Sequence, residues 1–483
     1  MTIIIGSSPA ILALGANLKI RLALMAATAL TVATPASAEE PSLQTEIALL
    51  KAQVAAQQQQ IAAQNAQLAA QAKQLQEIDA RLQTAVPPVS ALATSVPAGS
   101  APAPNPISPP ATTLADSSGA GGRGGSDTTI GGYGEVSYNA YVHDASRNQA
   151  DLKRFVLFFG HRFNDKLSLM SEVEFEHAVT SSSDKGEAEI EQAYLNYAFN
   201  PRLNVKAGLF LMPFGFINRS HEPPAFYGVE RNEIERRIIP STWREGGVSV
   251  WGSTPFGLAY DFGITTGFDF AKLDDPSAPL LATHQELQLA HAANLSVYGS
   301  LEYTAAPGVL IGGAVFTGKT GHSNADFKAD PTGPNFAGIG GRVTLWDVHA
   351  RVQRSGFDVE ALYTRGSFAN SAAIDQVILD FNMANGADRP VLPSSFYGWL
   401  VQGAYTLGLG GDVTLSPFVR YERYNTQARL PLGLIADPAN RDRVFTTGVS
   451  FKPISDVVVK LDYQKYIENS ANDRVNVGLG YQF

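Results

Sequence analysis

The chain has 483 residues, a formal net charge of −9 at pH 7 and no cysteine. Without thiols it can form no disulfide, thiolate metal site or cysteine nucleophile, and the acidic balance argues against a nucleic acid partner. After the N-terminal segment no run of about 18 apolar residues occurs, so the sequence predicts no transmembrane helix there, and any membrane residence would be through strands.

The N-terminal segment has the three parts of a secretory signal. Two basic residues precede the apolar stretch 22–32, and the small residues Ala36 and Ala38 come after it at the spacing of a cleavage site. A retained membrane anchor is the alternative, but the apolar stretch is too short to span a bilayer. We expect residues 1–38 to be a signal peptide and the mature chain to begin near Glu39.

Residues 43–83 have the heptad spacing of a coiled coil. One heptad series is apolar at every position: Ile47, Val54, Ile61, Leu68, Leu75 and Leu82. The second series carries three glutamines, which weaken it and set register or strand number. A helical coiled coil is the expected structure, and a disordered or single-helix stalk rich in Gln and Ala is the alternative.

Residues 84–128 are dominated by Pro, Ala, Ser, Thr and Gly. Such a stretch cannot bury enough apolar surface to offset the entropy lost on ordering, so it is expected to be a linker. It would decouple the coiled coil from the C-terminal part of the chain.

From residue 129 to 483 the pattern is two-residue alternation interrupted by turns. The expected strands are 129–142, 152–163, 167–176, 188–199, 203–211, 245–251, 257–267, 294–304, 309–317, 340–352, 357–365, 396–407, 412–424, 444–452, 457–466 and 473–483. Their number is even, as in closed bacterial barrels. The expected fold is therefore an all-β transmembrane barrel of about sixteen antiparallel strands, preceded by the coiled coil and the linker.

The connections between the strands support a barrel over a soluble sandwich. Every second connection is a tight turn with Gly, Pro, Asn or Asp, and the intervening ones are longer, the two longest reaching about thirty residues at 212–244 and 366–395. Outer-membrane barrels have this asymmetry, with short periplasmic turns and long outer loops, and a sandwich gives no reason for it.

The last strand carries the pattern most clearly. Val475, Val477 and Leu479 point to one side with Tyr481 and Phe483, and a polar, Gly-rich series points to the other. One side suits lipid and the other suits water.

Three other patterns in the sequence have simpler explanations than a ligand site. Residues 313–320 match the P-loop pattern, but the match falls on an expected strand with no helix after it, so nucleotide binding is not expected. The histidines show no HExxH or paired metal-ligand spacing, so neither a metal site nor a cofactor is predicted, and the chain is not expected to be an enzyme. Ile374, Val377, Ile378 and Phe381 have helical spacing, which indicates a short packed helix within the second long loop.

The chain resembles the phosphate-selective porin O and P family of Gram-negative bacteria over residues 129–483. The residues that carry the resemblance are Gly132-Tyr133-Gly134-Glu135, the run Glu191 to Tyr197, Ala207 to Phe210 leading into Pro213-Phe214-Gly215, the stretch from Glu230 to Val248, and the terminal Phe483. The resemblance implies a sixteen-stranded homotrimeric channel whose third outer loop folds into the lumen. It also implies that the C-terminal aromatics, Phe483 and Tyr481, are read by the outer-membrane assembly machinery.

A barrel of this size is wide enough for water, so selectivity must come from the residues that narrow it. The loop from Met212 to Arg244 is the expected constriction. Candidate pore-lining residues on this loop are Arg219, His221, Glu222, Arg231, Glu233, Arg236, Arg237 and Arg244, and those on the inward faces of strands are Arg154, Arg162, Arg420, Lys460 and Arg474. Two hypotheses stay open: the arginines attract anions such as phosphate, or they pair with the glutamates of the same loop and favour neither sign.

The leading functional hypothesis is passive diffusion of small polar or anionic solutes across the outer membrane of a Gram-negative bacterium. The alternative is a structural barrel whose coiled coil tethers the membrane to peptidoglycan or to a periplasmic partner. Expected partners in either case are the lipid bilayer with its lipopolysaccharide, the assembly machinery and two further copies of the chain.

Overall fold

The computed structural model of the chain describes Lys73 and residues 127–483. Apart from Lys73, the expected signal peptide, the expected coiled coil and nearly all of the expected linker lie outside these residues. Their assignments remain predictions.

The described part forms one antiparallel sheet of seventeen strands. The strands are β1 (Thr128–Tyr141), β2 (Gln149–Arg162), β3 (Leu167–Glu176), β4 (Ala188–Asn200), β5 (Leu203–Leu211), β6 (Arg244–Ser253), β7 (Leu258–Thr265), β8 (Ser296–Tyr303), β9 (Val309–Lys319), β10 (Arg342–Arg354), β11 (Phe357–Ala369), β12 (Ser395–Tyr405), β13 (Leu407–Gly410), β14 (Val413–Arg429), β15 (Arg441–Ile454), β16 (Val457–Tyr466) and β17 (Arg474–Gln482). Neighbours in the chain are neighbours in the sheet. The expected strands are therefore confirmed, most of them to within a few residues.

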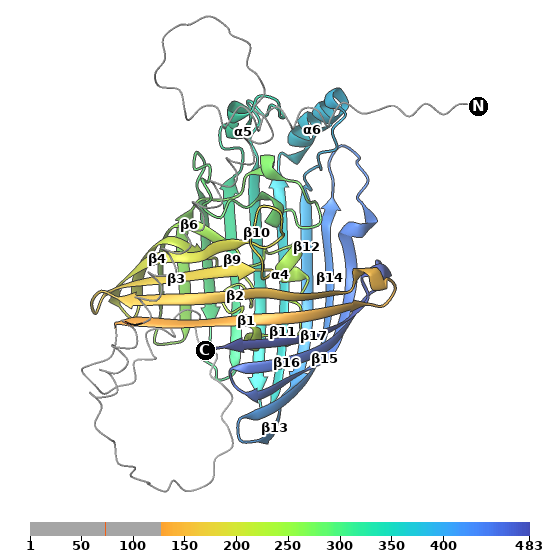
Figure 1. Cartoon of the computed structure of the whole chain (residues 1–483). Helices are drawn as coiled ribbons and strands as arrows, with labels where there is room; N and C mark the ends of the chain where they lie inside the picture. Colours follow the sequence, from red (N-terminus) through yellow and green to blue (C-terminus); the bar gives the residue numbers. More distant parts are fainter. Residues whose placement is uncertain (1–72, 74–126) are drawn as a thin grey trace, which may run out of the picture. The chain divides into compact units, whose positions relative to one another are not determined.

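The sheet closes on itself. β1 pairs with β2 on one side and with β17 on the other, so that Tyr133 faces Gln482 and Tyr141 faces Arg474. β12 and β13 both pair with β14 and are interrupted only at Thr406. They therefore count as one strand of the barrel, which has sixteen strands. Figure 1 shows the C-terminus beside β1, where the first and last strands meet.

Short and long connections alternate around the barrel, as expected. Helices α5 (Ala325–Ala329) and α6 (Ser371–Asn385) lie at the long-loop end, and β13 marks the short-turn end (Figure 1). The prediction of the second-longest loop was wrong: β11 runs on to Ala369, because its pairing with β10 continues past Gly366. The second-longest connection is instead 266–295, between β7 and β8, and the connection 370–394 after β11 is shorter.

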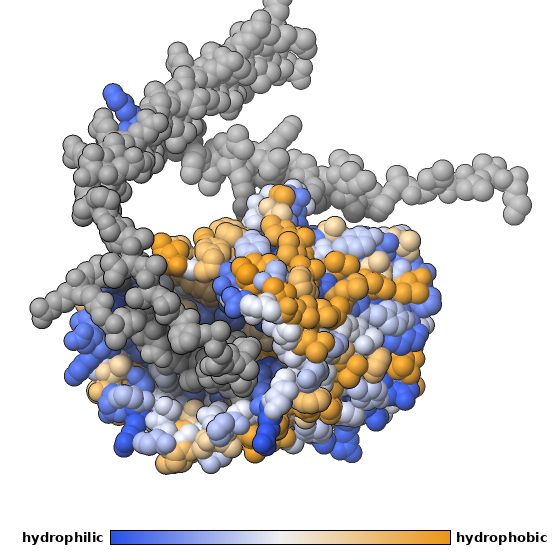
Figure 2. All heavy atoms as spheres, turned by 90° about the horizontal axis from the view of Figure 1, so that it is seen from below, coloured by the Kyte–Doolittle hydropathy of each residue, from blue (hydrophilic) through white to orange (hydrophobic). Residues whose placement is uncertain are grey.

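The strand faces separate apolar from polar side chains. On β17, Val475, Val477 and Leu479 are exposed on the outer face, whereas Asn476 is fully buried on the inner face. Figure 2 shows broad areas of apolar side chains on the outer surface, with hydrophilic ones concentrated toward its margins. An apolar outer wall around a polar interior is the arrangement that a bilayer requires of a barrel.

The helices of the described residues are short, and none is long and apolar enough to cross a membrane. α6 confirms the helix expected in the loop after β11, and it buries Ile374 and Ile378. The P-loop match lies mostly on β9, with Gly313 and Gly318 paired to β10, so the expectation that it falls on a strand is confirmed.

A buried aromatic cluster fixes both ends of the long β5–β6 connection. The ring of Trp243 lies 4.8 Å from Phe214, 5.2 Å from Phe268 and 5.0 Å from Phe316, measured between centroids. Phe214 and Trp243 belong to the beginning and end of that connection, and Phe316 belongs to the wall strand β9. The cluster thus sets where the connection leaves the wall and where it returns.

Candidate pore constriction

Residues 212–243, called here the constriction loop, fold inward and touch the barrel wall on several sides. The side chain of Glu230 accepts hydrogen bonds from Asn139 of β1 at 2.9 Å and from Lys153 of β2 at 3.0 Å. Tyr227 donates to Asp358 of β11 at 2.8 Å. Because β1 and β11 are widely separated around the barrel, the loop crosses the lumen.

The middle of the loop also lies along the inner face of the last strands. Lys460 of β16 donates to the carbonyl oxygen of Gly228 at 2.8 Å, and Asp462 accepts from the amide of Val229 at 2.6 Å. A Cβ at Gly480 of β17 would lie 2.2 Å from the Cβ of Pro223. The Gly-rich inner series of the last strand is therefore explained by the close approach of the loop.

The short helix α4 (Ile234–Arg237) gives the loop its second half. Its apolar side, Ile234 and the adjoining Ile238, is fully buried against β12, where a Cβ at Gly398 would lie 2.8 Å from Ile234. This packing turns Glu233, Arg236 and Arg237 toward the polar interior.

Glu233 is the centre of the strongest group of contacts in the loop. Its carboxylate lies 3.1 Å from Arg236 and 2.5 Å from Arg237, and it accepts a hydrogen bond from the Tyr466 hydroxyl at 2.8 Å. Burial raises the pKa of Glu233, but the two arginines outweigh burial and bring the pKa down to about 2. Glu233 is therefore charged at neutral pH, and its single charge is shared by the two arginines.

The other predicted loop residues contact the wall or the loop itself. Arg219 lies 2.6 Å from Glu302 of β8, and Arg231 donates to the Thr242 hydroxyl at 2.9 Å. Arg244 is the first residue of β6 and lies 2.6 Å from Glu189 and 2.7 Å from Glu286. Glu222 precedes a short 3-10 helix, η3 (Pro223–Ala225), and makes no side-chain capping bond there.

His221 is buried at the wall of β3 and β4. Its Nε2 atom lies 3.7 Å from Glu172 and 3.5 Å from Glu191. Burial lowers the pKa of His221, but these two carboxylates outweigh burial and raise it to about 9.

Of the five basic strand residues predicted to line the pore, four contact the constriction loop or a wall residue that binds it. Arg154 donates to the carbonyl oxygen of His221 at 2.6 Å, Arg420 lies 2.8 Å from Glu422, and Glu422 in turn accepts from the amide of Glu233. Lys460 binds the loop at Gly228, and Arg474 donates to Gln464 at 2.7 Å and lies near Tyr466. Arg162, at the short-turn end of β2, is exposed and stands apart from this group.

Sequence reasoning missed Lys153 as an anchor of the loop. Between β1 and β2 the register shifts at Glu135/Val136, and Lys153 is the extra residue, so it turns inward although strict alternation puts it among lipid-facing residues. A lysine in the otherwise apolar series with Phe155 and Leu157 was the signal, because a charge facing lipid is costly.

Comparisons with known proteins agree with this architecture. Residues 131–242, from β1 through the constriction loop, match the family model described as phosphate-selective porin O and P. An uncharacterized protein of Aquifex aeolicus (strain VF5) is 31% identical over 364 residues, covering 74% of this chain and 80% of the relative.

Solved outer-membrane proteins are similar to the chain at low sequence identity. OmpF of Salmonella typhi, determined in complex with daunomycin, superposes with a TM-score of 0.50 at 13% identity, covering 74% of this chain and 97% of that one. The outer membrane channel DcaP of Acinetobacter baumannii gives a TM-score of 0.46 at 12% identity, covering 75% and 99%.

A closed barrel with an apolar outer wall and a loop across its lumen defines the class of outer-membrane porins. The chain belongs to the phosphate-selective porin O and P family. It is an outer-membrane channel of a Gram-negative bacterium, and the family and the fold point to a channel rather than an enzyme.

Proposed function

We propose that the barrel conducts small hydrophilic solutes by passive diffusion and that the constriction loop sets both the width and the charge of the pathway. The observation that carries the proposal is the path of the loop, which is bound to β1, β2, β8, β11 and β16 from within. A loop held on so many sides cannot swing out of the lumen without breaking several buried contacts.

The charges of the loop favour weak selectivity over a phosphate-specific pathway. Arg219 has Glu302 at 2.6 Å, Arg236 and Arg237 share Glu233 at 3.1 Å or less, and Arg244, which follows the loop at the start of β6, has Glu189 and Glu286 within 2.7 Å. A paired guanidinium has most of its field cancelled and its donors occupied, so it binds passing anions weakly. Of the two hypotheses drawn from the sequence, the mixed-sign lining is therefore the one we propose.

Single-channel recording of the mature protein in a planar bilayer tests this proposal. We expect an open channel with a small reversal potential in a salt gradient and no block by millimolar phosphate. Phosphate block with a strong anion preference would instead favour the arginine pathway.

We further propose a homotrimer, as the family resemblance implies, and a role for the C-terminal aromatics in assembly. Phe483 exchanges backbone hydrogen bonds with Gly132 of β1 at 2.9 and 3.0 Å, yet the residue is 66% exposed. An exposed ring at the seam where the barrel closes suits recognition by the assembly machinery. The tether hypothesis depends on residues 43–83, outside the described residues, and stays a prediction.

A further inference from the structure

Where the constriction loop meets β3 and β4, four glutamates and a histidine lie close together, and few positive charges balance the carboxylates. We call Glu172, Glu174, Glu189, Glu191 and His221 the glutamate cluster. Potential ligand atoms of Glu172, Glu191 and His221 lie within 4.8 Å of one another, and so do those of Glu174, Glu189 and Glu191. The side chain of Glu191 is fully buried, and those of Glu172 and His221 are only 1% and 3% exposed.

A β-bulge delivers Glu191 to this place. Glu172 pairs with Gln192 and Val173 pairs with Ile190, so Glu191 is an extra residue on β4. Bulges re-aim side chains, and here the bulge adds a carboxylate to an interior that already holds Glu172 and Glu174. Regular pairing would leave the interior with one acidic group fewer.

Several polar atoms of the cluster point at one another without hydrogen-bond partners. Both carboxylate oxygens of Glu191, Oε1 of Glu174 and Nε2 of His221 are buried and unpartnered. Buried polar atoms are rarely left in this state, because an unmet donor or acceptor costs about 1–3 kcal/mol and a charged one more. Four such atoms in one place indicate that a ligand binds between them.

The neighbouring cations do not balance the cluster. Arg154 lies 2.8 Å from Glu135, and Arg244 is shared between Glu189 and Glu286. Gln192 and Tyr133 donate to Glu172 but carry no charge. Among the described residues, His221 is thus the only ion-pair partner of Glu172 and Glu191, and Glu174 has none, while Arg154, Arg231 and Arg244 act on the cluster from farther away. Buried carboxylates in such a position require a further compensating charge.

We propose that the glutamate cluster is a binding site for a divalent metal ion of the zinc or manganese class, with Glu172, Glu191 and His221 as ligands. An imidazole combined with carboxylates suits these metals better than it suits Mg²⁺ or Ca²⁺, which prefer oxygen alone. The ion would bind His221 of the constriction loop to β3 and β4, and so hold the loop at this side of the lumen. Metal binding does not depend on conduction, so the proposal can fail independently of the proposed function.

The test is calorimetric titration of Zn²⁺ into the chelator-treated mature protein in detergent, with Co²⁺ absorption as a direct report of nitrogen and oxygen ligation. We expect one zinc ion per chain, and at least about tenfold weaker binding in Glu191→Gln and in His221→Asn. Asp261→Asn removes a different buried carboxylate of the lumen, one paired with Lys206 of β5 and not with the loop, and should bind zinc as the wild type does.

Absence of stoichiometric zinc binding by the wild-type protein would overturn the proposal, and so would equal affinity in Glu191→Gln. In that case the carboxyl groups share protons instead of a metal. His221→Asn lies on the loop and leaves the barrel strands intact, so it answers the question even if the strand variant does not fold.

A second inference rests on the outer face at the long-loop end of β11 to β15. Arg423 and Arg443 lie directly opposite each other on neighbouring strands, and both are exposed. Arg443 pairs with Glu468, but within the described residues Arg423, Arg429 and Arg441 have no side-chain partner. Like charges directly opposite on a sheet are destabilising, so an anion between them is favoured.

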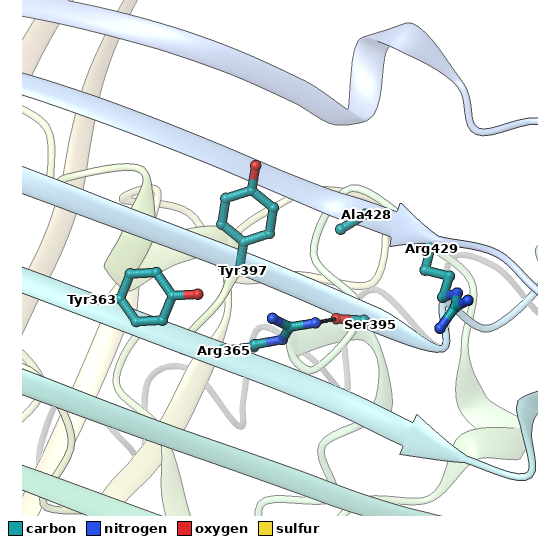
Figure 3. A pocket seen from close by; sticks show the side chains of 6 residues that line it. All are labelled: Tyr363, Arg365, Ser395, Tyr397, Ala428 and Arg429. Carbon is teal, nitrogen blue, oxygen red and sulfur yellow. Dashed lines mark hydrogen bonds between the residues drawn. The ribbon is translucent and has the colours of Figure 1, made fainter.

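We call Arg365, Arg423, Arg429, Arg441 and Arg443 the outer arginine patch. Two adjoining hollows lie beside these arginines. One has a volume of about 420 Å³ and is lined by Tyr363, Arg365, Ser395, Tyr397, Ala428 and Arg429 (Figure 3). The other, of about 280 Å³, shares Tyr397 and includes Arg423, Arg441 and Arg443. Tyrosines at this level mark the membrane interface, where the headgroups lie.

We infer that the outer arginine patch binds the phosphate groups of lipid A in the outer leaflet. Guanidinium groups bind phosphate through paired donors. The hollows have room for the headgroup, and the tyrosine rings can contact the first carbons of its acyl chains. The patch faces away from the lumen, so it is separate from the solute pathway.

Native mass spectrometry of the detergent-solubilised protein with added diphosphoryl lipid A tests this inference. We expect Arg423→Ala/Arg441→Ala to weaken binding by about tenfold. The control pair Arg202→Ala/Arg354→Ala removes two exposed arginines from the short-turn end and should leave binding unchanged. Equal binding by both double variants, full competition by inorganic phosphate, or burial of the patch between copies of the chain would contradict it.

Discussion

Arg219 of the constriction loop lies 2.6 Å from the carboxylate of Glu302 on β8. This ion pair holds the first half of the loop on the side of the barrel opposite Glu230, which is bound by Asn139 and Lys153. The position of the loop thus depends on charge pairs with the wall on two sides of the lumen, and each pair can be removed by a single substitution.

Replacing Arg219 with alanine should loosen the loop. Glu302 is only about a tenth exposed and would keep only His349, 3.6 Å away, as a basic partner. Loss of the charged hydrogen bond from Arg219 should cost roughly 2 kcal/mol. We expect larger open-channel current fluctuations and a lower unfolding temperature than in the wild type. Arg202→Ala, an exposed arginine in a short turn, is the control, and identical fluctuations in both variants would refute a role for the pair.

Acid should weaken the second half of the loop. The pKa of Glu233 falls from its ordinary 4.5 to about 2 in the folded protein. The stabilisation from Glu233 is therefore fully present above about pH 4.5 and is lost as pH falls through about 2. Limited proteolysis of the loop between pH 5 and about 2 should show increasing cleavage. In Glu233→Gln this pH dependence should be absent, and its persistence would assign the effect to other groups.

The loop after β11 should respond to pH in the opposite direction. Burial raises the pKa of Asp375 in α6 from 3.8 to about 7, against the hydrogen bond from the Leu392 amide. Stabilisation is thus complete below about pH 3.8 and is lost as pH rises through about 7. Amide hydrogen exchange in α6, corrected for its intrinsic pH dependence, should report greater opening at pH 8 than at pH 5. Asp375→Asn should keep the helix protected at both values, and unchanged opening in that variant would count against the buried carboxyl.

A methyl group on the inner face of β17 should displace the loop. The Cβ of an alanine at Gly480 would lie 2.2 Å from Pro223, whereas a Cβ at Gly403 of β12 meets nothing within 4 Å. Overpacking of this kind costs about 1–3 kcal/mol. Thermal unfolding should show Gly480→Ala destabilised and Gly403→Ala unchanged, and equal stabilities would mean that the loop does not rest on β17.

Much of the barrel could be predicted from the sequence because lipid and water impose a strict period of two on each strand. Turn residues such as Gly, Pro and Asn then mark where strands end. What alternation cannot predict is a bulge: Lys153 and Glu191 both turn inward only because their strands carry an extra residue. The path of the constriction loop was also beyond prediction, since it depends on contacts such as Tyr466 with Glu233, which are far apart in the chain.

The most direct test of the central claim is single-channel conductance of the folded mature protein, measured for the wild type and for Arg236→Glu. The Arg236 side chain is 38% exposed beside the fully buried Glu233, so it is the loop arginine best placed to meet a passing ion. Arg354→Glu, which makes the same charge change on the outer face of β10 at the short-turn end, is the control. The account predicts an open channel whose reversal potential shifts toward cations in Arg236→Glu alone. A folded barrel without conductance, or an equal shift in both variants, would contradict it.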